Sequence, residues 1–299
     1  MKKSDFDLHM HSFYSDDGEY SPGELVTRCQ NAGIHVMAIA DHNSVRGVRE
    51  ACEKAAEIGI LCIPAIEIDT VFESVNIHVL GYGIDVKSED FGAIEENITR
   101  QSKDASWKMF RETQELGFTI TTEELEALEN NGNFRGRWTG EMFAEVLLAR
   151  SEYRDHELLK PYRPNGTRGD NPFVNFYWDY YAQGKPCHAE VKYPALEEVL
   201  RVIHKNGGKA VLAHPGLYFW KQPEQLGRLL ESGLDGVEAF SSYHTTAQAE
   251  KYRQEAGKRG LFSSGGSDFH GKIKPAVRLG EFGCPFLAQE MKFCDILRK

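Results

Sequence analysis

The feature that most constrains the fold of this chain is an alternation of short aliphatic runs with helix-like segments near both ends of the sequence. The aliphatic runs predict strands at 5–11, 36–41, 61–68, 76–83, 209–215, 235–240 and 261–268. The segments between them predict helices at 21–33, 45–58, 195–206, 223–232 and 245–259. Ser21, Glu24 and Gly33 delimit the first helix as caps. Alternating strands and helices are typical of buried parallel sheets, so the pattern predicts an α/β fold.

The pattern changes between residues 88 and 190, where amphipathic helical segments are richer in charged and aromatic residues. We interpret 88–190 as a helical insertion that caps the substrate site, within a discontinuous catalytic domain at 1–87 and 191–299. Its polar loop at 163–172 contains Pro and Gly and is the segment that we expect to be most mobile. Aromatic residues at helical spacing in 171–183 favour a core face over a platform for stacked bases.

Composition limits the partners and the chemistry. The chain has 35 Lys and Arg against 45 Asp and Glu, so its net charge of −10 repels long nucleic acids but allows a local site for a short anion. Its six cysteines include no C-x-x-C pair, which favours reduced thiols and a metal site built from His and carboxylates. No signal peptide or membrane helix is evident, so we expect a soluble, cytoplasmic protein without an obligate protein partner.

Side chains that bind metals stand at the ends of most predicted strands. His9 and His11 are two residues apart, so a strand places both imidazoles on one face. The remaining candidates are the loop residue Asp16 and the strand-end residues His42, Glu67, His78, His214, Asp268 and His270. One histidine alone is weak evidence, but this set gathers on the rim where barrel enzymes build their active sites. The sequence therefore predicts a metal centre of imidazole and carboxylate ligands, which suit Mn, Fe or Zn.

Several segments together resemble one family. They are DLHMHSFYSDDGEYSPGELV, AIADHNSV, IPAIEI, IHVLGYG, VLAHPG, DGVEAF and SSGGSDFHG. This set is similar to the PHP (polymerase and histidinol phosphatase) metal-dependent phosphoesterases. The resemblance implies a distorted (β/α)7 barrel, and GRW at 136–138 with GKPCHAEV at 184–191 looks like the insertion of stand-alone PHP nucleotide phosphatases.

The resemblance also implies three divalent metal ions. His9, His11, Glu67 and Asp268 would hold the first, and Glu67 would bridge to a second held by His78 and His214. Asp16, His42 and His270 would hold the third. Two adjacent aspartates stand where the family has one. Asp16 keeps the family's spacing from His11, so we predict Asp16, with Asp17 as the alternative.

Two further residues are predicted to act on the substrate. Arg137 is expected to grip phosphate oxygens, because a guanidinium can bind them through two hydrogen bonds. His244, just after the sixth strand, is expected to protonate the leaving oxygen. For Asp41 we weigh a carboxylate that orients an imidazole against an end-of-strand cap, and for Glu238 a rim carboxylate against a satisfied buried acid.

We therefore expect hydrolysis of a phosphate ester of a small metabolite, most of all a nucleoside monophosphate or 3′,5′-bisphosphate, by a metal-activated hydroxide. One alternative is a 5′→3′ exonuclease on short RNA. A second is an amidohydrolase, which would require a bridging Lys on the fourth strand where this chain has His78. A third is a non-catalytic metal-binding module, which the complete ligand set disfavours.

Overall fold

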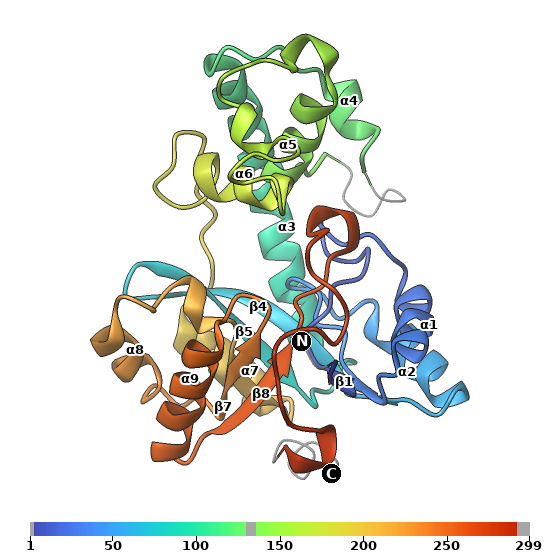
Figure 1. Cartoon of the computed structure of the whole chain (residues 1–299). Helices are drawn as coiled ribbons and strands as arrows, with labels where there is room; N and C mark the ends of the chain where they lie inside the picture. Colours follow the sequence, from blue (N-terminus) through green and yellow to red (C-terminus); the bar gives the residue numbers. More distant parts are fainter. Residues whose placement is uncertain (1–2, 130–135, 292–299) are drawn as a thin grey trace.

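The computed structural model describes residues 3–129 and 136–291, and the strands in these ranges form two sheets. The smaller sheet has the order β1–β2–β3 and is parallel, with β1 at Phe6–Asp7, β2 at Val36–Met37 and β3 at Leu61–Cys62. The larger has the order β4–β5–β6–β7–β8, with β4 at Ala65–Phe72, β5 at Val75–Tyr82, β6 at Lys209–Leu212, β7 at Gly236–Ser241 and β8 at Phe262–Gly266. Both sheets lie in the lower part of the view in Figure 1.

The strand predicted at 61–68 is two strands, and the second of them starts a hairpin. Pro64 separates β3 from β4, since a proline has no N–H to continue a ladder. Glu73 and Ser74 then form a two-residue turn at φ 46° and 70°, as type I′ hairpin turns require. β5 consequently runs antiparallel to both β4 and β6, whereas β6, β7 and β8 are parallel. The expectation of a parallel sheet is therefore wrong for β5.

Backbone hydrogen bonds join the two sheets on both sides. On one side the N–H of Leu8 donates to Gly265 O at 3.2 Å, and the N–H of Asp268 donates to His9 O at 2.8 Å. On the other side the N–H of Glu67 donates to Asp41 O at 3.1 Å. The assigned strands in the described residues nevertheless do not form one closed sheet, so the (β/α)7 barrel stays a prediction.

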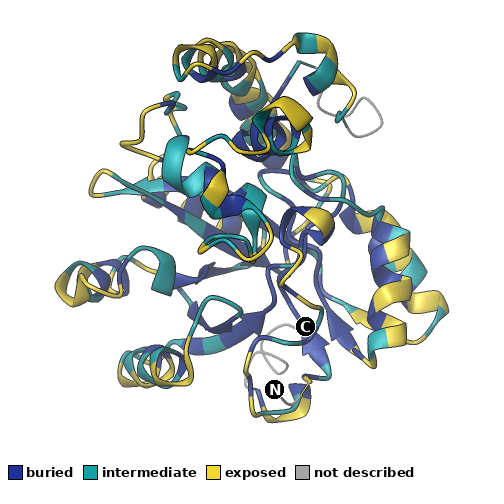
Figure 2. Ribbon diagram, turned by 45° about the horizontal axis from the view of Figure 1, so that its top comes forward, coloured by how far each residue is buried: buried dark blue, intermediate teal, exposed yellow. Residues whose placement is uncertain are grey.

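Amphipathic helices cover the sheets from outside. They are α1 at Pro22–Ala32, α2 at Val48–Glu57, α7 at Leu196–Lys205, α8 at Pro223–Leu229 and α9 at Thr246–Lys258. The predicted capping box of Ser21 and Glu24 is present, and Gly33 ends α1 in the left-handed conformation. Figure 2 shows these helices with buried residues toward the sheets and exposed residues outward. None of the described helices has the length and apolar composition that crossing a membrane requires.

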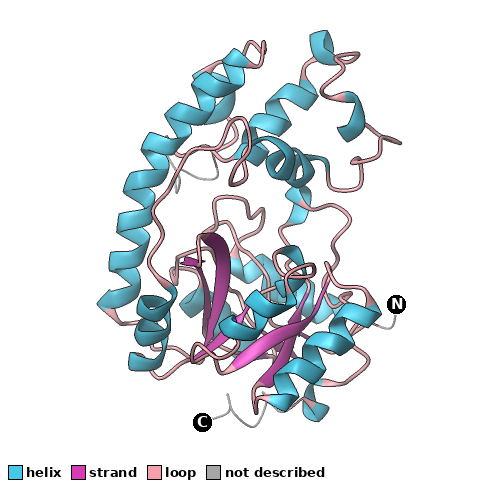
Figure 3. Cartoon of the chain, turned by 90° about the vertical axis from the view of Figure 1, so that its left-hand side faces the viewer, coloured by secondary structure: helices cyan, strands magenta, loops and turns pink. Residues whose placement is uncertain are grey.

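The segment between β5 and β6 forms a helical part that has a hydrophobic core of its own. Its helices are α3 at Glu89–Glu115, α4 at Thr122–Glu126, α5 at Gly140–Ala149 and α6 at Pro172–Tyr180. The long helix α3 runs from the level of the sheets up to the other three (Figure 3). Phe176 and Tyr181 are buried in this second core, with Phe173, Tyr177 and Tyr180 packed against it, as their helical spacing predicted.

Candidate metal centre

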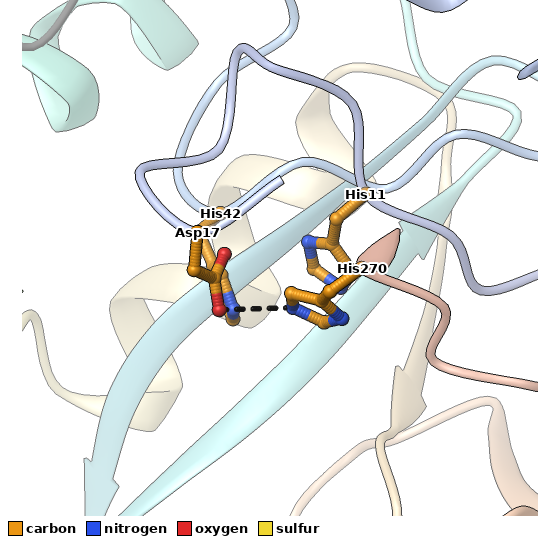
Figure 4. A group of neighbouring side chains, drawn as sticks. All are labelled: His11, Asp17, His42 and His270. Carbon is orange, nitrogen blue, oxygen red and sulfur yellow. Dashed lines mark ion pairs between the residues drawn. The ribbon is translucent and has the colours of Figure 1, made fainter. Parts of the chain in front are cut away.

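The structure brings together every predicted metal ligand except Asp16. Four overlapping groups of ligand atoms lie close enough to share ions: His11, Asp17, His42 and His270; His9, His11, Glu67 and Asp268; His42, Asp69 and His78; and Glu67, His78 and His214. Figure 4 shows the first group, with Asp17 opposite His270 and beside His42. These side chains come from the chain after β1, from the segment after β2, from the β4–β5 hairpin and from the segments after β6 and β8.

Glu67 lies at the centre of this cluster and is fully buried. Its Oε2 lies 3.2 Å from each of His9 Nε2, His11 Nε2 and His42 Nδ1, and its Oε1 lies 3.0 Å from His78 Nδ1 and 3.1 Å from His214 Nε2. Burial alone would raise the pKa of Glu67, but the charges of the surrounding imidazoles hold it well below its usual range. The carboxylate is thus ionised and placed between two groups of ligands.

Asp268 is the second carboxylate of the centre, and its two oxygens face different neighbours. Oδ1 lies 3.1 Å from His11 Nε2 and 3.4 Å from His9 Nε2. Oδ2 accepts hydrogen bonds from Tyr243 Oη at 2.7 Å and from Lys274 Nζ at 2.6 Å. The backbone of Asp268 has φ 58°, a left-handed conformation that non-glycine residues rarely adopt and that occurs preferentially at functional sites.

Asp17 takes the place that the spacing from His11 assigned to Asp16. Asp17 Oδ2 lies 3.0 Å from His270 Nε2, whereas Asp16 Oδ2 accepts a hydrogen bond from Arg137 Nη2 at 3.1 Å. The chain folds back tightly here, and a Cβ on Gly18 would collide with the carbonyl oxygen of Ser12. This turn presents Asp17 to the cluster and Asp16 to the helical part. The structure therefore corrects the predicted third-group carboxylate from Asp16 to Asp17.

The ligand atoms fit divalent metal ions. In the described part of the chain, the buried atoms without a hydrogen-bond partner include His9 Nε2, His11 Nε2, Asp17 Oδ1, His42 Nδ1, Glu67 Oε2 and His270 Nε2. Buried polar atoms are normally hydrogen-bonded, because leaving them unpaired costs free energy. Such atoms converge here from imidazoles and carboxylates, the donor set that binds Mn, Fe or Zn.

Glu238 orients two of these ligands from β7. Its Oε1 lies 2.9 Å from His9 Nδ1, and its Oε2 accepts the backbone N–H of His214 at 2.8 Å. A carboxylate on one ring nitrogen fixes the tautomer that leaves the other nitrogen for a metal. Glu238 is fully buried and both of its oxygens have partners, so it is the satisfied buried acid of the two interpretations, and its partners are two of the predicted metal ligands.

Asp41 combines both roles that the sequence left open. It caps the loop after β1, because Oδ1 accepts the N–H of Ser12 at 2.6 Å and Oδ2 accepts Ser12 Oγ at 2.7 Å. It also accepts Ser15 Oγ at 3.1 Å, and Ser15 Oγ lies 2.9 Å from His11 Nδ1. Asp41 thereby orients the imidazole of His11 through one hydroxyl.

A pocket adjoins the metal-binding cluster, and its walls come from both the sheet part and the helical part. Its lining includes His42, His78, His214 and Asp268 from the cluster, and Arg137, Trp138, Glu141, Tyr177, Trp178 and Tyr181 from the helical part. Arg137 is buried, and its Nη1 donates to Thr99 Oγ1 of α3 at 2.7 Å. The structure thus places the predicted phosphate-binding residue in the wall of this pocket.

The geometry does not support His244 as a proton donor. Its Nε2 accepts the backbone N–H of Gly216 at 3.0 Å, and its Nδ1 donates to Ala239 O at 2.8 Å. It is not among the described residues that line the pocket. Burial lowers the pKa of His244 to about 4, so its imidazole is neutral at pH 7. We correct its role to a structural one, in which it ties the segment after β6 to β7.

Sequence reasoning missed three residues beside the ligands. Asp69 Oδ1 lies 3.1 Å from His78 Nε2, and the period of two along a strand could have placed Asp69 on the same face as Glu67. Tyr243 and Lys274 line the pocket next to Asp268, and nothing in their local sequence marked them.

Curated proteins similar to this chain act on phosphate esters. A phosphoribosyl 1,2-cyclic phosphate 1,2-diphosphodiesterase of Eggerthella lenta is 27% identical, covering 92% of this chain and 97% of the relative. A 3′,5′-nucleoside bisphosphate phosphatase of Chromobacterium violaceum is 28% identical, covering 89% of this chain and 87% of the relative. A 5′-3′ exoribonuclease of Haemophilus influenzae is 27% identical, covering 89% of each chain.

Solved structures share the same fold. One, described as an amidohydrolase from Chromobacterium violaceum with bound sulfate and no metal, has a TM-score of 0.75 at 25% identity, covering 92% of this chain and 91% of the other. Another, described as a metal-dependent phosphoesterase from Bifidobacterium adolescentis, has a TM-score of 0.75 at 28% identity, covering 93% and 91%. A model of the PHP domain matches residues 7–161, more than half of the sequence. The chain therefore belongs to the PHP domain family.

Proposed function

We propose that this protein hydrolyses the phosphate ester of a small metabolite, specifically a nucleotide such as a nucleoside monophosphate or 3′,5′-bisphosphate. The observation that carries the proposal is the convergence of unpaired imidazole and carboxylate atoms beside a pocket that also contains Arg137. The relatives support the class of reaction, because each is named for cleavage of a phosphate ester. They differ in substrate, so the nucleotide monoester is our choice among related substrates.

We propose that three divalent ions of Mn, Fe or Zn bind the cluster. Glu67 would be shared between a group with His9, His11 and Asp268 and a group with His78 and His214. Asp17, His42 and His270 would complete the third group. When bound, such ions supply Lewis acids for phosphoryl oxygens and lower the pKa of water.

The helical part is proposed to cap the substrate. Arg137 would bind phosphate oxygens through its guanidinium, while Asp16 and Thr99 hold that guanidinium from two sides. Tyr177 and Trp178 are partly exposed, line the same pocket and offer apolar surface to a base or sugar. The similar structure from Chromobacterium violaceum is described as having bound sulfate, which supports binding of an oxyanion by this fold.

A 5′→3′ exonuclease on short RNA is the second candidate. The exoribonuclease of Haemophilus influenzae supports it, and so do the aromatic side chains of the pocket. The net charge of −10 favours a small anion over a long polymer. An amidohydrolase would require a bridging Lys, and the central bridging position holds Glu67 instead.

Product analysis tests the proposal. Purified protein loaded with manganese is incubated with a nucleoside 5′-monophosphate, a 3′,5′-bisphosphate and a 5′-phosphorylated pentaribonucleotide. Inorganic phosphate from the small substrates at rates well above pentanucleotide cleavage is the expected result. The opposite order of rates would favour the exonuclease, and ammonia release from adenosine compounds without phosphate release would favour the amidohydrolase. The Asp268→Ala variant should be inactive with an unchanged circular dichroism spectrum, whereas Asp170→Ala, in an exposed loop, should match wild type.

A further inference from the structure

Lys274 is a buried ammonium group in the wall of the pocket. Only 8% of its side chain is exposed, and it follows the 3-10 helix η4 at Gly271–Ile273. Burying a lysine costs free energy unless its charge meets an anion. Its position next to the candidate metal centre therefore requires an explanation.

Gly271 makes this position possible. The glycine has φ 75°, and a Cβ there would collide with Glu19 Oε2. The chain turns at this point, and the N–H of Lys274 donates to Gly271 O at 3.2 Å. The turn brings the ammonium back to Asp268, six positions earlier, whereas Lys272 points elsewhere and pairs with Glu145 at 2.8 Å.

Asp268 uses only part of the hydrogen-bonding capacity of Lys274. An ammonium has three N–H donors, and Asp268 Oδ2 accepts one of them. The same oxygen also accepts Tyr243 Oη, so it has a neutral partner besides the lysine. The ammonium lies 5.4 Å from the centre of the Tyr243 ring, which is within the range of a cation–π contact. This contact does not require a hydrogen bond from the ammonium. Lys274 thus has donors left for a second anion.

The pocket is rich in carboxylates, so an anion can bind there only next to its few cationic groups. Among the described residues that line it, Arg137 and Lys274 are the arginine and lysine side chains, against the carboxylates of Asp16, Asp17, Asp69, Glu95, Glu141 and Asp268. Arg137 is held by Asp16 and Thr99, and Lys274 by Asp268. A phosphate group carries several acceptor oxygens, so it can use a second cation next to the metal ligands.

We propose that Lys274 is a catalytic residue that donates a hydrogen bond to a non-bridging oxygen of the phosphoryl group. This inference rests on the proposed function and adds a second cationic contact to that of Arg137. Loss of one charge-assisted hydrogen bond to phosphate weakens binding by about 10- to 100-fold.

The test uses inorganic phosphate as the probe. Its dissociation constant is measured by calorimetry with the manganese-loaded full chain, as wild type and as the Lys274→Gln variant. Glutamine keeps an N–H donor for Asp268 but removes the positive charge. The expected result is phosphate binding weaker by about 10- to 100-fold, with unchanged manganese content by mass spectrometry. Lys274→Arg should recover part of the affinity, and the matched control Lys272→Gln should equal wild type.

Two results of the calorimetric test would overturn the inference. One is wild-type phosphate affinity in Lys274→Gln, and the other is a loss of affinity that disappears once the manganese content is restored. If wild type releases no phosphate from any substrate but Lys274→Gln still weakens phosphate binding, the proposed function fails and the anion contact stands. Should the variants fold poorly, a phosphate-soaked crystal of wild type decides: an anion within hydrogen-bond distance of Nζ supports the contact, and an anion bound elsewhere refutes it.

Discussion

Glu238 lies 2.9 Å from the Nδ1 of His9 and holds the segment after β6 through the backbone N–H of His214. One carboxylate therefore positions ligands from two distant parts of the sequence. Glu238→Gln should lower manganese affinity by about 10- to 100-fold, because outer partners of a ligating histidine fix its tautomer. Calorimetric titration with Mn²⁺ measures this effect. The exposed Glu231→Gln variant is the control, and an unchanged affinity in Glu238→Gln would contradict the assignment.

Asp16 and Asp17 should fail in different ways. Asp17→Asn should lose metal, and its kcat/KM should fall by more than about 100-fold. Removing a metal ligand is expected to reduce activity more than removing a residue that only orients a ligand. Asp16→Asn should keep its metal and raise KM about 10-fold, because it releases one charge-assisted hydrogen bond to Arg137. Metal analysis and steady-state kinetics of both variants separate these outcomes. Metal loss confined to Asp16→Asn would reverse the assignment.

His244 should affect the pH dependence of stability rather than catalysis. Burial lowers its pKa in the folded protein to about 4. In the unfolded chain the histidine has an ordinary pKa of about 6.5. Between pH 4 and pH 6.5 the unfolded chain therefore binds a proton at His244 that the folded protein does not bind. The stability contributed by neutral His244 is thus present above pH 6.5 and is lost as the pH falls toward 4, by about 2 kcal/mol at pH 5.

Urea unfolding at pH 7 and pH 5 measures this loss. His244→Gln should show a smaller decrease than wild type, while His35→Gln, at an exposed position, should not. His244→Gln should also keep kcat at pH 7 within a few-fold of wild type. A large fall in kcat with an intact fold would restore the role of proton donor.

Removing metal should destabilise the protein, because the buried carboxylates and imidazoles then lose the ions that would pair with them. Binding at 1,000 times the dissociation constant contributes about 4 kcal/mol, which corresponds to a Tm change of about 6 °C in a chain of this size. Calorimetry with a chelator and then with excess Mn²⁺ tests the reversible shift. An identical Tm in both conditions would argue against metal binding at this centre.

Much of the site could be predicted because strand geometry places residue types in known directions. The period of two predicted that His9 and His11 share a face, and both reach Glu67 Oε2 although the strand itself ends at Asp7. Asp268 and His270 follow another strand at the same rim. Asp17 could not be predicted, because the tight turn at Gly18 decides which of two adjacent aspartates enters the cluster. Lys274 was missed for a similar reason, since Gly271 sets its direction.

The fold was predictable where local patterns were unambiguous. The caps of α1 and its amphipathic face agree with the sequence. The β4–β5 hairpin was not recognised, since Glu73 and Ser74 lack the glycine or asparagine that usually marks such turns. The second hydrophobic core depends on contacts such as that of Phe143 with Tyr181. These residues are far apart in the sequence, so a local pattern cannot predict that they meet.

The central position of Glu67 has a consequence for biosynthesis. Glu67 and His78 meet in a local hairpin soon after they are made, but Asp268 must still join them from 201 positions beyond Glu67. A growing chain can therefore bring together only some of the predicted metal ligands until its last third has been synthesised. Binding of metal by all of these ligands would consequently be a late step, and truncated chains ending before Asp268 should bind Mn²⁺ more weakly than the full chain.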